Sequence, residues 1–158
     1  MRENMQPSSC RLRTDVAVEV PDSIEREVIL PAPPPRVWAA LTRADQLGAW
    51  FGTRAEVDLR PGGEVVFTWD TETGPHISRG VIETIEPTRL FAFRWQANPG
   101  EPSMTLVEFT LEPDAEGTRL RVVESGFASL PPHLRTRESH VEGWQRELRE
   151  LAEYLAEA

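Results

Sequence analysis

The sequence predicts an α+β fold in which a curved antiparallel sheet of about seven strands packs around a long C-terminal helix. In the C-terminal segment, apolar residues recur at helical spacing at Val141, Trp144, Leu148, Leu151 and Leu155. Between residues 55 and 125, apolar and polar residues alternate with a period of two, interrupted by short turns. The helix and the sheet each have one apolar face, so we expect the two faces to pack together.

The N-terminal residues predict a tail followed by one domain. Residues 1–22 are mainly small, polar or charged, and we expect a flexible tail there and a single domain over residues 23–158. Within the tail, residues 14–20 alternate weakly and are a candidate for an additional edge strand. Residues 24–30 are the first strand of the domain.

Two short helices are expected between the first two strands of the sheet. A proline-rich run over residues 31–35 ends the first strand, and its last proline suits the first turn of a helix. Thr42, with Asp45 three residues later, resembles a capping box and predicts a second helix that ends near Gly48. The pair is too short to form a helical bundle and is expected to cover part of the sheet.

The remaining strands follow at short intervals and lead to the long helix. We expect them at residues 55–59, 65–69, 77–85, 90–96, 105–111 and 120–125. A loop containing Pro131 and Pro132 then leads to a helix over residues 139–156. The face of this helix opposite its apolar stripe carries charged residues that we expect to be exposed: Arg146, Glu147, Arg149, Glu150, Glu153 and Glu157.

Composition excludes several classes of function. The chain has 158 residues, a formal net charge of −9 and a single cysteine, Cys10. An acidic chain is unsuited to nonspecific nucleic-acid binding and to anionic membrane surfaces. No apolar run reaches the ~18 residues of a membrane span, so we expect no membrane insertion. A single cysteine cannot form an internal disulfide and fits a reducing compartment, so we expect a cytoplasmic protein.

Several short stretches, taken in their order along the chain, carry a family resemblance. They are residues 24–27, 35–41, 50–51, 60–63, 80–87, 89–90, Trp95, 117–120, 124–127, 143–144, Leu148 and Leu151. Together they resemble the START-like superfamily, also called SRPBCC, whose fold is the helix-grip fold. Within it, the chain is similar to homologues of the activator of heat-shock-protein ATPase.

The resemblance implies a helix-grip domain with a cavity between the sheet and the long helix. The superfamily includes lipid carriers, hormone-binding proteins and aromatic polyketide cyclases. We therefore expect non-catalytic binding of a small hydrophobic or aromatic molecule, in a carrier, sensor or stress-related role and without a cofactor. The candidate cavity lining is Trp50, Phe67, Trp69, Phe93, Trp95, Phe109, Trp144 and Leu148. The alternative that these side chains simply fill the core stays open.

Two other classes of function also stay open. A cyclase- or hydrolase-like enzyme needs a general acid or base in the cavity, and the candidates on the strands are His76, Arg79, Glu83, Arg94 and Glu108. We assign most of these to the exposed face or to a loop, and expect no catalysis. His133 and His140 have no further ligands at metal-binding spacing, so we expect no metal site. An interaction module, similar to the co-chaperone domain, is the third class, and a homodimer would form through an edge strand within residues 14–30.

Overall fold

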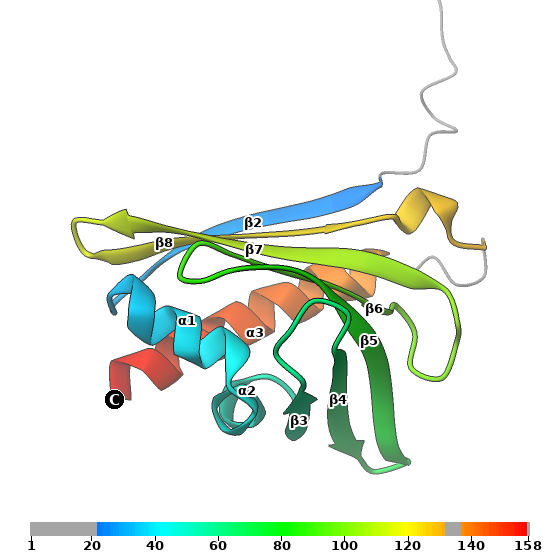
Figure 1. Ribbon diagram of the computed structural model, residues 1–158. Helices are drawn as coiled ribbons and strands as arrows, with labels where there is room; N and C mark the ends of the chain where they lie inside the picture. Colours follow the sequence, from blue (N-terminus) through cyan, green and yellow to red (C-terminus); the bar gives the residue numbers. More distant parts are fainter. Residues whose placement is uncertain (1–21, 132–136, 158) are drawn as a thin grey trace, which may run out of the picture.

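A seven-stranded antiparallel sheet and three α-helices form the protein in the computed structural model, which describes residues 22–131 and 137–157 (Figure 1). The strands are β2 (Ser23–Leu30), β3 (Arg54–Val57), β4 (Glu64–Thr71), β5 (Gly74–Glu86), β6 (Leu90–Gln96), β7 (Met104–Asp114) and β8 (Gly117–Ser125). The helices are α1 (Pro34–Thr42), α2 (Ala44–Trp50) and α3 (Arg137–Glu157). This arrangement confirms the predicted α+β helix-grip architecture, with two short helices between the first two strands.

The order of the strands in the sheet is β2-β8-β7-β6-β5-β4-β3. Strands β3 to β8 are therefore neighbours in the order of the chain, whereas β2 crosses to the far side and pairs with β8, from Ser23 opposite Ser125 to Leu30 opposite Thr118. Gly117 begins β8 with φ +144°, and a Cβ there would lie 2.1 Å from the carbonyl oxygen of Leu30. Only glycine allows the end of β2 to come this close.

The core lies between the concave face of the sheet and α3. Along β7, Val107, Phe109 and Leu111 are buried, as period-two alternation predicts. The apolar stripe of α3 lies against this face, with Trp144, Leu148, Leu151 and Leu155 all buried. In Figure 1, α3 runs beneath the sheet, and α1 and α2 lie beside its C-terminal part.

The predicted capping box at Thr42 is wrong. The residue that precedes the first turn of α2 is Arg43, and no side chain caps this helix. The hydroxyl of Thr42 instead donates a hydrogen bond of 2.8 Å to the carbonyl of Trp38, one turn back in α1. The helix also continues to Trp50 rather than ending near Gly48, and the indole of Trp50 donates to the carbonyl of Ala40 at 2.8 Å, which joins α2 to α1.

Other boundaries shift by a few residues. Strand β5 begins at Gly74 rather than at residue 77 and therefore includes His76. Strand β3 ends at Val57 rather than at residue 59. Residues 1–21, with the candidate edge strand at residues 14–20, lie outside the described part of the chain. Asp22 is described, and its carbonyl accepts hydrogen bonds from the backbone of Gly126 and Phe127 just after β8.

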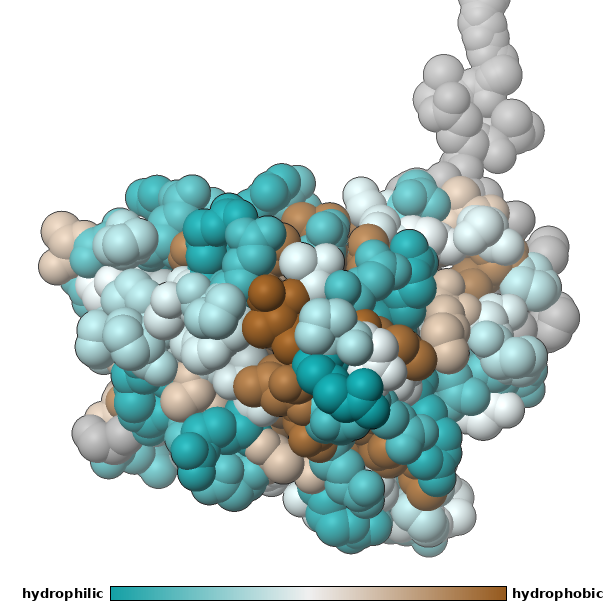
Figure 2. All heavy atoms as spheres, viewed as in Figure 1, coloured by the Kyte–Doolittle hydropathy of each residue, from teal (hydrophilic) through white to brown (hydrophobic). Residues whose placement is uncertain are grey.

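The surface seen in Figure 2 is mainly hydrophilic, and the apolar residues of this face gather near its middle. Within residues 22–131 and 137–157, the longest helix is amphipathic, and none is long and apolar enough to cross a membrane.

Candidate functional site

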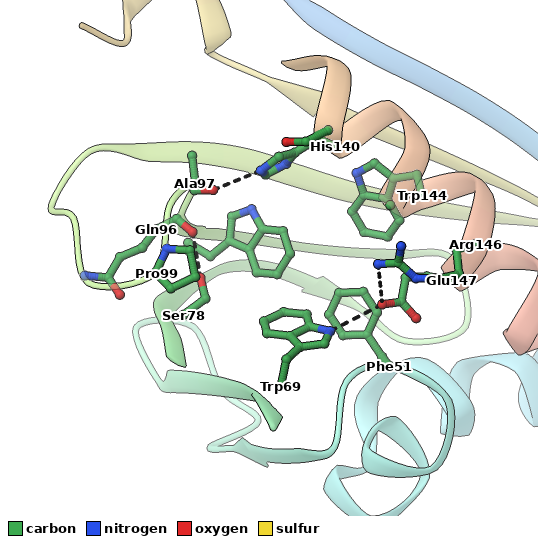
Figure 3. A pocket seen from close by; sticks show the side chains of 13 residues that line it. Phe51, Trp69, Ser78, Gln96, Ala97, Pro99, His140, Trp144, Arg146 and Glu147 are labelled. Carbon is green, nitrogen blue, oxygen red and sulfur yellow. Dashed lines mark hydrogen bonds and ion pairs between the residues drawn. The ribbon is translucent and has the colours of Figure 1, made fainter. Parts of the chain in front are cut away.

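A pocket of about 170 Å³ opens between the N-terminal half of α3 and the adjacent ends of β4, β5 and β6 (Figure 3). Its walls come from segments that are distant in sequence. The lining residues are Phe51, Trp69, Ser78, Trp95, Gln96, Ala97, Pro99, Ser139, His140, Gly143, Trp144, Arg146 and Glu147. The pocket lies between the sheet and the N-terminal half of α3. That it is a ligand cavity stays a prediction.

Four aromatic rings form the apolar part of the wall. Phe51, just after α2, is stacked on Trp95 and Trp144, with ring centroids 5.8 and 5.7 Å apart. It also meets Trp69 edge to face at 5.5 Å. Contacts of this kind add to the stability gained by burial and hold the rings in fixed orientations. The end of α2 therefore supplies a central ring that joins the sheet to α3.

A buried carboxylate, Glu124 of β8, lies behind this aromatic wall and is fully inaccessible to solvent. Its Oε1 accepts hydrogen bonds from Trp144 Nε1 and lies 2.8 Å from His140 Nδ1. Its Oε2 accepts from Trp95 Nε1 at 2.9 Å and from the Thr105 hydroxyl at 2.5 Å. An ionised carboxylate has about four acceptor positions. All four are occupied, so Glu124 has no free acceptor position for a ligand.

His140, in the first turn of α3, is held between two acceptors. Its Nδ1 faces Glu124, and its Nε2 lies 2.9 Å from the carbonyl oxygen of Ala97. Each ring nitrogen must donate a proton to make its bond, and only the imidazolium form carries both protons. The geometry therefore describes a charged His140 paired with an ionised Glu124.

The pKa values of this pair shift in the direction that the geometry requires. Burial disfavours charge on both groups. For Glu124 this effect is outweighed by the hydrogen bond and charge of His140 and by the bonds from Thr105 and Trp95, so the pKa of the carboxyl is lowered. For His140, burial is outweighed by the hydrogen bond and charge of Glu124 and by the Ala97 carbonyl, so the pKa of the imidazole is raised.

The prediction that Glu147 lies on the exposed face of the long helix is wrong. It is 5% exposed and borders the pocket (Figure 3). Its Oε2 accepts a long hydrogen bond of 3.4 Å from Trp69 Nε1 and lies 3.9 Å from Arg146 Nη2. Burial raises the pKa of the Glu147 carboxyl to about 7, with a further contribution from the charge of Glu150, while Trp69 and Arg146 oppose the shift.

The strand residues that the sequence offered as general acids or bases do not border this pocket. His76, Arg79, Glu83 and Arg94 are exposed, and Glu108 is half-buried. Glu83 instead pairs with Arg94 across β5 and β6 on the outer face. No group of three or more histidine, cysteine, aspartate or glutamate residues in the described ranges is placed to hold a metal ion, and His133 lies outside those ranges.

The eight candidate lining residues divide into two sets. Trp69, Trp95 and Trp144 border the pocket. The other five are buried in the core away from its wall: Trp50, Phe67, Phe93, Phe109 and Leu148. Direct contact of any of them with a ligand stays a prediction.

Sequence reasoning missed most residues of the site. Four of those missed make its main aromatic and polar contacts, and for two of these four the sequence held a signal. Glu124 lies in phase with Leu120 and Val122 on β8, so the alternation that predicts a buried face also includes this carboxylate. Glu147 is three residues after Trp144 and is therefore next to the apolar stripe of α3. The other two are Phe51 and His140, whose places depend on contacts between distant segments.

A model of the family described as Activator of Hsp90 ATPase homolog 1-like protein matches residues 31–156. Similar solved structures include protein MLL2253 from Mesorhizobium loti, with 22% sequence identity, a TM-score of 0.72, and coverage of 86% of this chain and 98% of that one. Another is protein CV1439 from Chromobacterium violaceum, with 24% identity, a TM-score of 0.70, and coverage of 85% and 98%. At these identities the likeness concerns the fold alone.

Two further solved structures are similar to the chain. DynU16, a protein in the dynemicin biosynthetic locus, shares 25% identity with a TM-score of 0.73, and the match covers 87% of this chain and 48% of that one. CalU16 from Micromonospora echinospora shares 25% identity with a TM-score of 0.63, over 84% and 74% of the two chains. No curated protein matches the chain.

Proposed function

The chain belongs to the Activator of Hsp90 ATPase homolog 1-like family, and from that premise we propose that it binds a small hydrophobic or aromatic molecule without transforming it, as a carrier or sensor. The observation that carries this proposal is the pocket beside α3, in which Phe51, Trp69, Trp95 and Trp144 form an apolar wall. Apolar concave sites with a few polar groups are the usual form of a ligand site. The likeness to a protein of the dynemicin biosynthetic locus agrees with a small-molecule ligand.

The size of the pocket limits the ligand. About 170 Å³ is below the roughly 300–1,000 Å³ of pockets that enclose drug-sized molecules. It is close to the roughly 150 Å³ of an engineered apolar cavity that binds benzene. The proposed ligand is therefore a molecule with one ring, or the ring of a larger molecule whose remainder extends out of the pocket mouth.

Binding without catalysis is favoured by the state of the polar groups. Glu124 has all its acceptor positions occupied, and both nitrogens of His140 are engaged. The hydroxyl of Ser78, on the pocket wall, donates to the carbonyl of Gln96 at 2.6 Å, and no histidine in the described ranges is hydrogen-bonded to it. A serine nucleophile requires such a base.

Native mass spectrometry of the protein purified from its own host tests the proposal directly, because a bound molecule adds its mass to the folded chain. A titration with indole, followed by tryptophan fluorescence, provides a second test. Gly143 borders the pocket, and a Cβ there would meet only Arg146 Nη2, at 3.9 Å, so Gly143→Leu is expected to fill the mouth and abolish binding. Gln145→Leu, on the exposed side of the same helix, is the matched control and should bind normally. Binding unaffected by Gly143→Leu would contradict this location for the site.

A second candidate function, general acid–base catalysis of a cyclase- or hydrolase-like kind, is favoured by one observation. Glu147 borders the pocket and has a pKa of about 7, which suits proton transfer near neutral pH. If the protein is such an enzyme, Glu147→Gln abolishes turnover of its substrate while leaving binding largely intact. If it is a carrier, incubation with a bound ligand leaves that ligand chemically unchanged.

The proposed setting is the cytoplasm, which agrees with a chain that has a single cysteine. A homodimer is also proposed, through the edge strand β2, which lies at one end of the described sheet. Edge strands present backbone groups that a second copy can pair with. Sedimentation velocity over a range of concentrations tests this, because a dimer of this kind changes its sedimentation coefficient as it dissociates.

A further inference from the structure

Glu147 is a buried carboxylate with few partners. The residue is 5% exposed, yet its hydrogen bond from Trp69 Nε1 is long, at 3.4 Å, and its ion pair with Arg146 spans 3.9 Å. Buried carboxylates usually accept several short hydrogen bonds, as Glu124 does in the same protein. The carboxylate of Glu147 therefore retains acceptor positions that a group entering the pocket can use.

The surroundings of Glu147 favour a positively charged group. Figure 3 shows its carboxylate facing the indole N–H of Trp69, and Phe51 and Trp144 line the same pocket. Aromatic faces attract cations through the negative potential above the ring, and tryptophan does so most strongly. A carboxylate and several aromatic rings at one pocket thus combine two separate attractions for an ammonium group.

The nearby guanidinium of Arg146 is a poor partner for the Glu147 carboxylate. Its side chain is 58% exposed, and it approaches Glu147 only at 3.9 Å. A contact of this length with a side chain that is itself mostly in water is weakened by solvent screening, although Glu147 is buried. An ammonium group within the pocket would be shielded from water by the rings, so its bond to Glu147 would be the stronger one.

We infer that the ligand of this pocket is a small aromatic or apolar amine, bound as a cation with its ammonium group on the Glu147 carboxylate and its ring against Phe51 and the pocket tryptophans. This inference rests on the proposed binding function and specifies the chemical class of the ligand. The same carboxylate repels the carboxylate of an acidic ligand and offers a neutral alcohol only an uncharged hydrogen bond.

Three probes of nearly equal size separate these possibilities: 2-phenylethylamine as the cation, 2-phenylethanol as the neutral molecule and 3-phenylpropionate as the anion. Calorimetric titration at about pH 8, where a carboxyl with a pKa of about 7 is mostly ionised, is expected to show the amine binding at least tenfold more tightly than the alcohol, and the acid most weakly. Glu147→Gln is expected to reduce the affinity for the amine about tenfold and to change that for the alcohol less than about twofold.

Glu153→Gln is the matched control, because it removes the same charge from an exposed position of α3. If this variant loses the preference for the amine as fully as Glu147→Gln does, the preference comes from the acidic surface as a whole and the inference is overturned. Equal or tighter binding of the alcohol or the acid by the unmodified protein also overturns it, while leaving the proposed binding function intact. Failure of all three probes to bind overturns the inference together with the proposed ring-sized ligand.

Discussion

The Nδ1 atom of His140 and the Oε1 atom of Glu124 lie 2.8 Å apart, so a charged pair joins the first turn of α3 to the end of β8. The Glu124 carboxylate is fully buried, and the His140 side chain is 15% exposed. The same carboxylate also accepts the indole N–H groups of Trp95 and Trp144, one from the sheet and one from the helix. A polar network therefore fixes the N-terminal half of α3 over the sheet, next to the pocket.

Removal of the Glu124 charge from this network is expected to destabilise the protein strongly. Glu124→Gln leaves a buried imidazolium without its counterion and places an amide donor among groups that are themselves donors. The expected loss is about 3–5 kcal/mol in the free energy of unfolding. Urea denaturation measures it, with Glu83→Gln, in an exposed pair with Arg94, as the control that should lose less than about 1 kcal/mol. Equal losses in the two variants would show that the buried pair has no special role.

The stability of the protein is expected to fall as the pH rises through neutrality. Glu147 has a folded pKa of about 7 against an ordinary value of 4.5, so between these values the native state holds more protons and rising pH favours unfolding. His140 acts in the same direction above pH 6.5, because its folded pKa is raised. Glu124 acts below about pH 4.5, where its lowered pKa makes stability fall as the pH falls. Denaturation curves at several pH values should therefore show a maximum on the acidic side of neutrality.

Glu147→Gln separates the contribution of Glu147 from that of His140. An uncharged amide at this position has no proton to lose, so the variant should gain roughly 2–3 kcal/mol relative to the unmodified protein at pH 8 and less than about 1 kcal/mol at pH 5. Urea denaturation at the two pH values measures the difference. Glu153→Gln serves as the exposed control, and a gain of the same size there would assign the effect to net charge instead.

Trp144 is expected to contribute both apolar burial and a hydrogen bond. It is 3% exposed, so Trp144→Ala should lower the free energy of unfolding by about 3–5 kcal/mol. Trp144→Phe keeps an aromatic ring but leaves Glu124 with one donor fewer, and about 1–3 kcal/mol should be lost. A loss below about 1 kcal/mol for the alanine variant would contradict the packing of α3 described here.

Gly143→Ala is expected to change stability and binding in opposite directions. Glycine within a helix is less favourable than alanine by about 0.5–1 kcal/mol, and the new methyl group would meet no atom closer than Arg146 Nη2 at 3.9 Å. The variant should therefore be more stable, while the methyl group narrows the pocket and weakens binding of a ring-sized ligand. Thermal unfolding and an indole titration measure the two effects. Improved binding together with improved stability would place the ligand elsewhere.

The sequence was sufficient for the fold because periodicity reports which face of an element is buried. The alternation along β7 and the stripe on α3 are properties of single elements, and both predict the observed burial. The capping box at Thr42 failed because its hydroxyl has a competing acceptor, the Trp38 carbonyl, that is present whenever α1 forms.

The site was less predictable because its polar groups depend on contacts between distant segments. The donors to Glu124 come from β6, β7 and α3, and no spacing in the sequence marks them as partners. One usable signal was the position of Glu124 in phase with the buried residues of β8, since such a side chain must find partners within the protein. The other was the position of Glu147 beside the apolar stripe of α3. The burial of Glu147 is not predicted by its charge, which is typical of exposed residues, although its helical position adjoins the apolar stripe.

The pairing of β2 with β8 affects how the chain can fold during synthesis. The first strand leaves the ribosome long before its partner, since Leu30 pairs with Thr118 and Ser23 with Ser125. Until β8 emerges, β2 has no neighbour, and the growing meander ends in an open edge that can pair with other chains. We therefore expect nascent chains halted before β8 to be the most prone to aggregate, and release of the last strand and helix to complete the domain in one cooperative step.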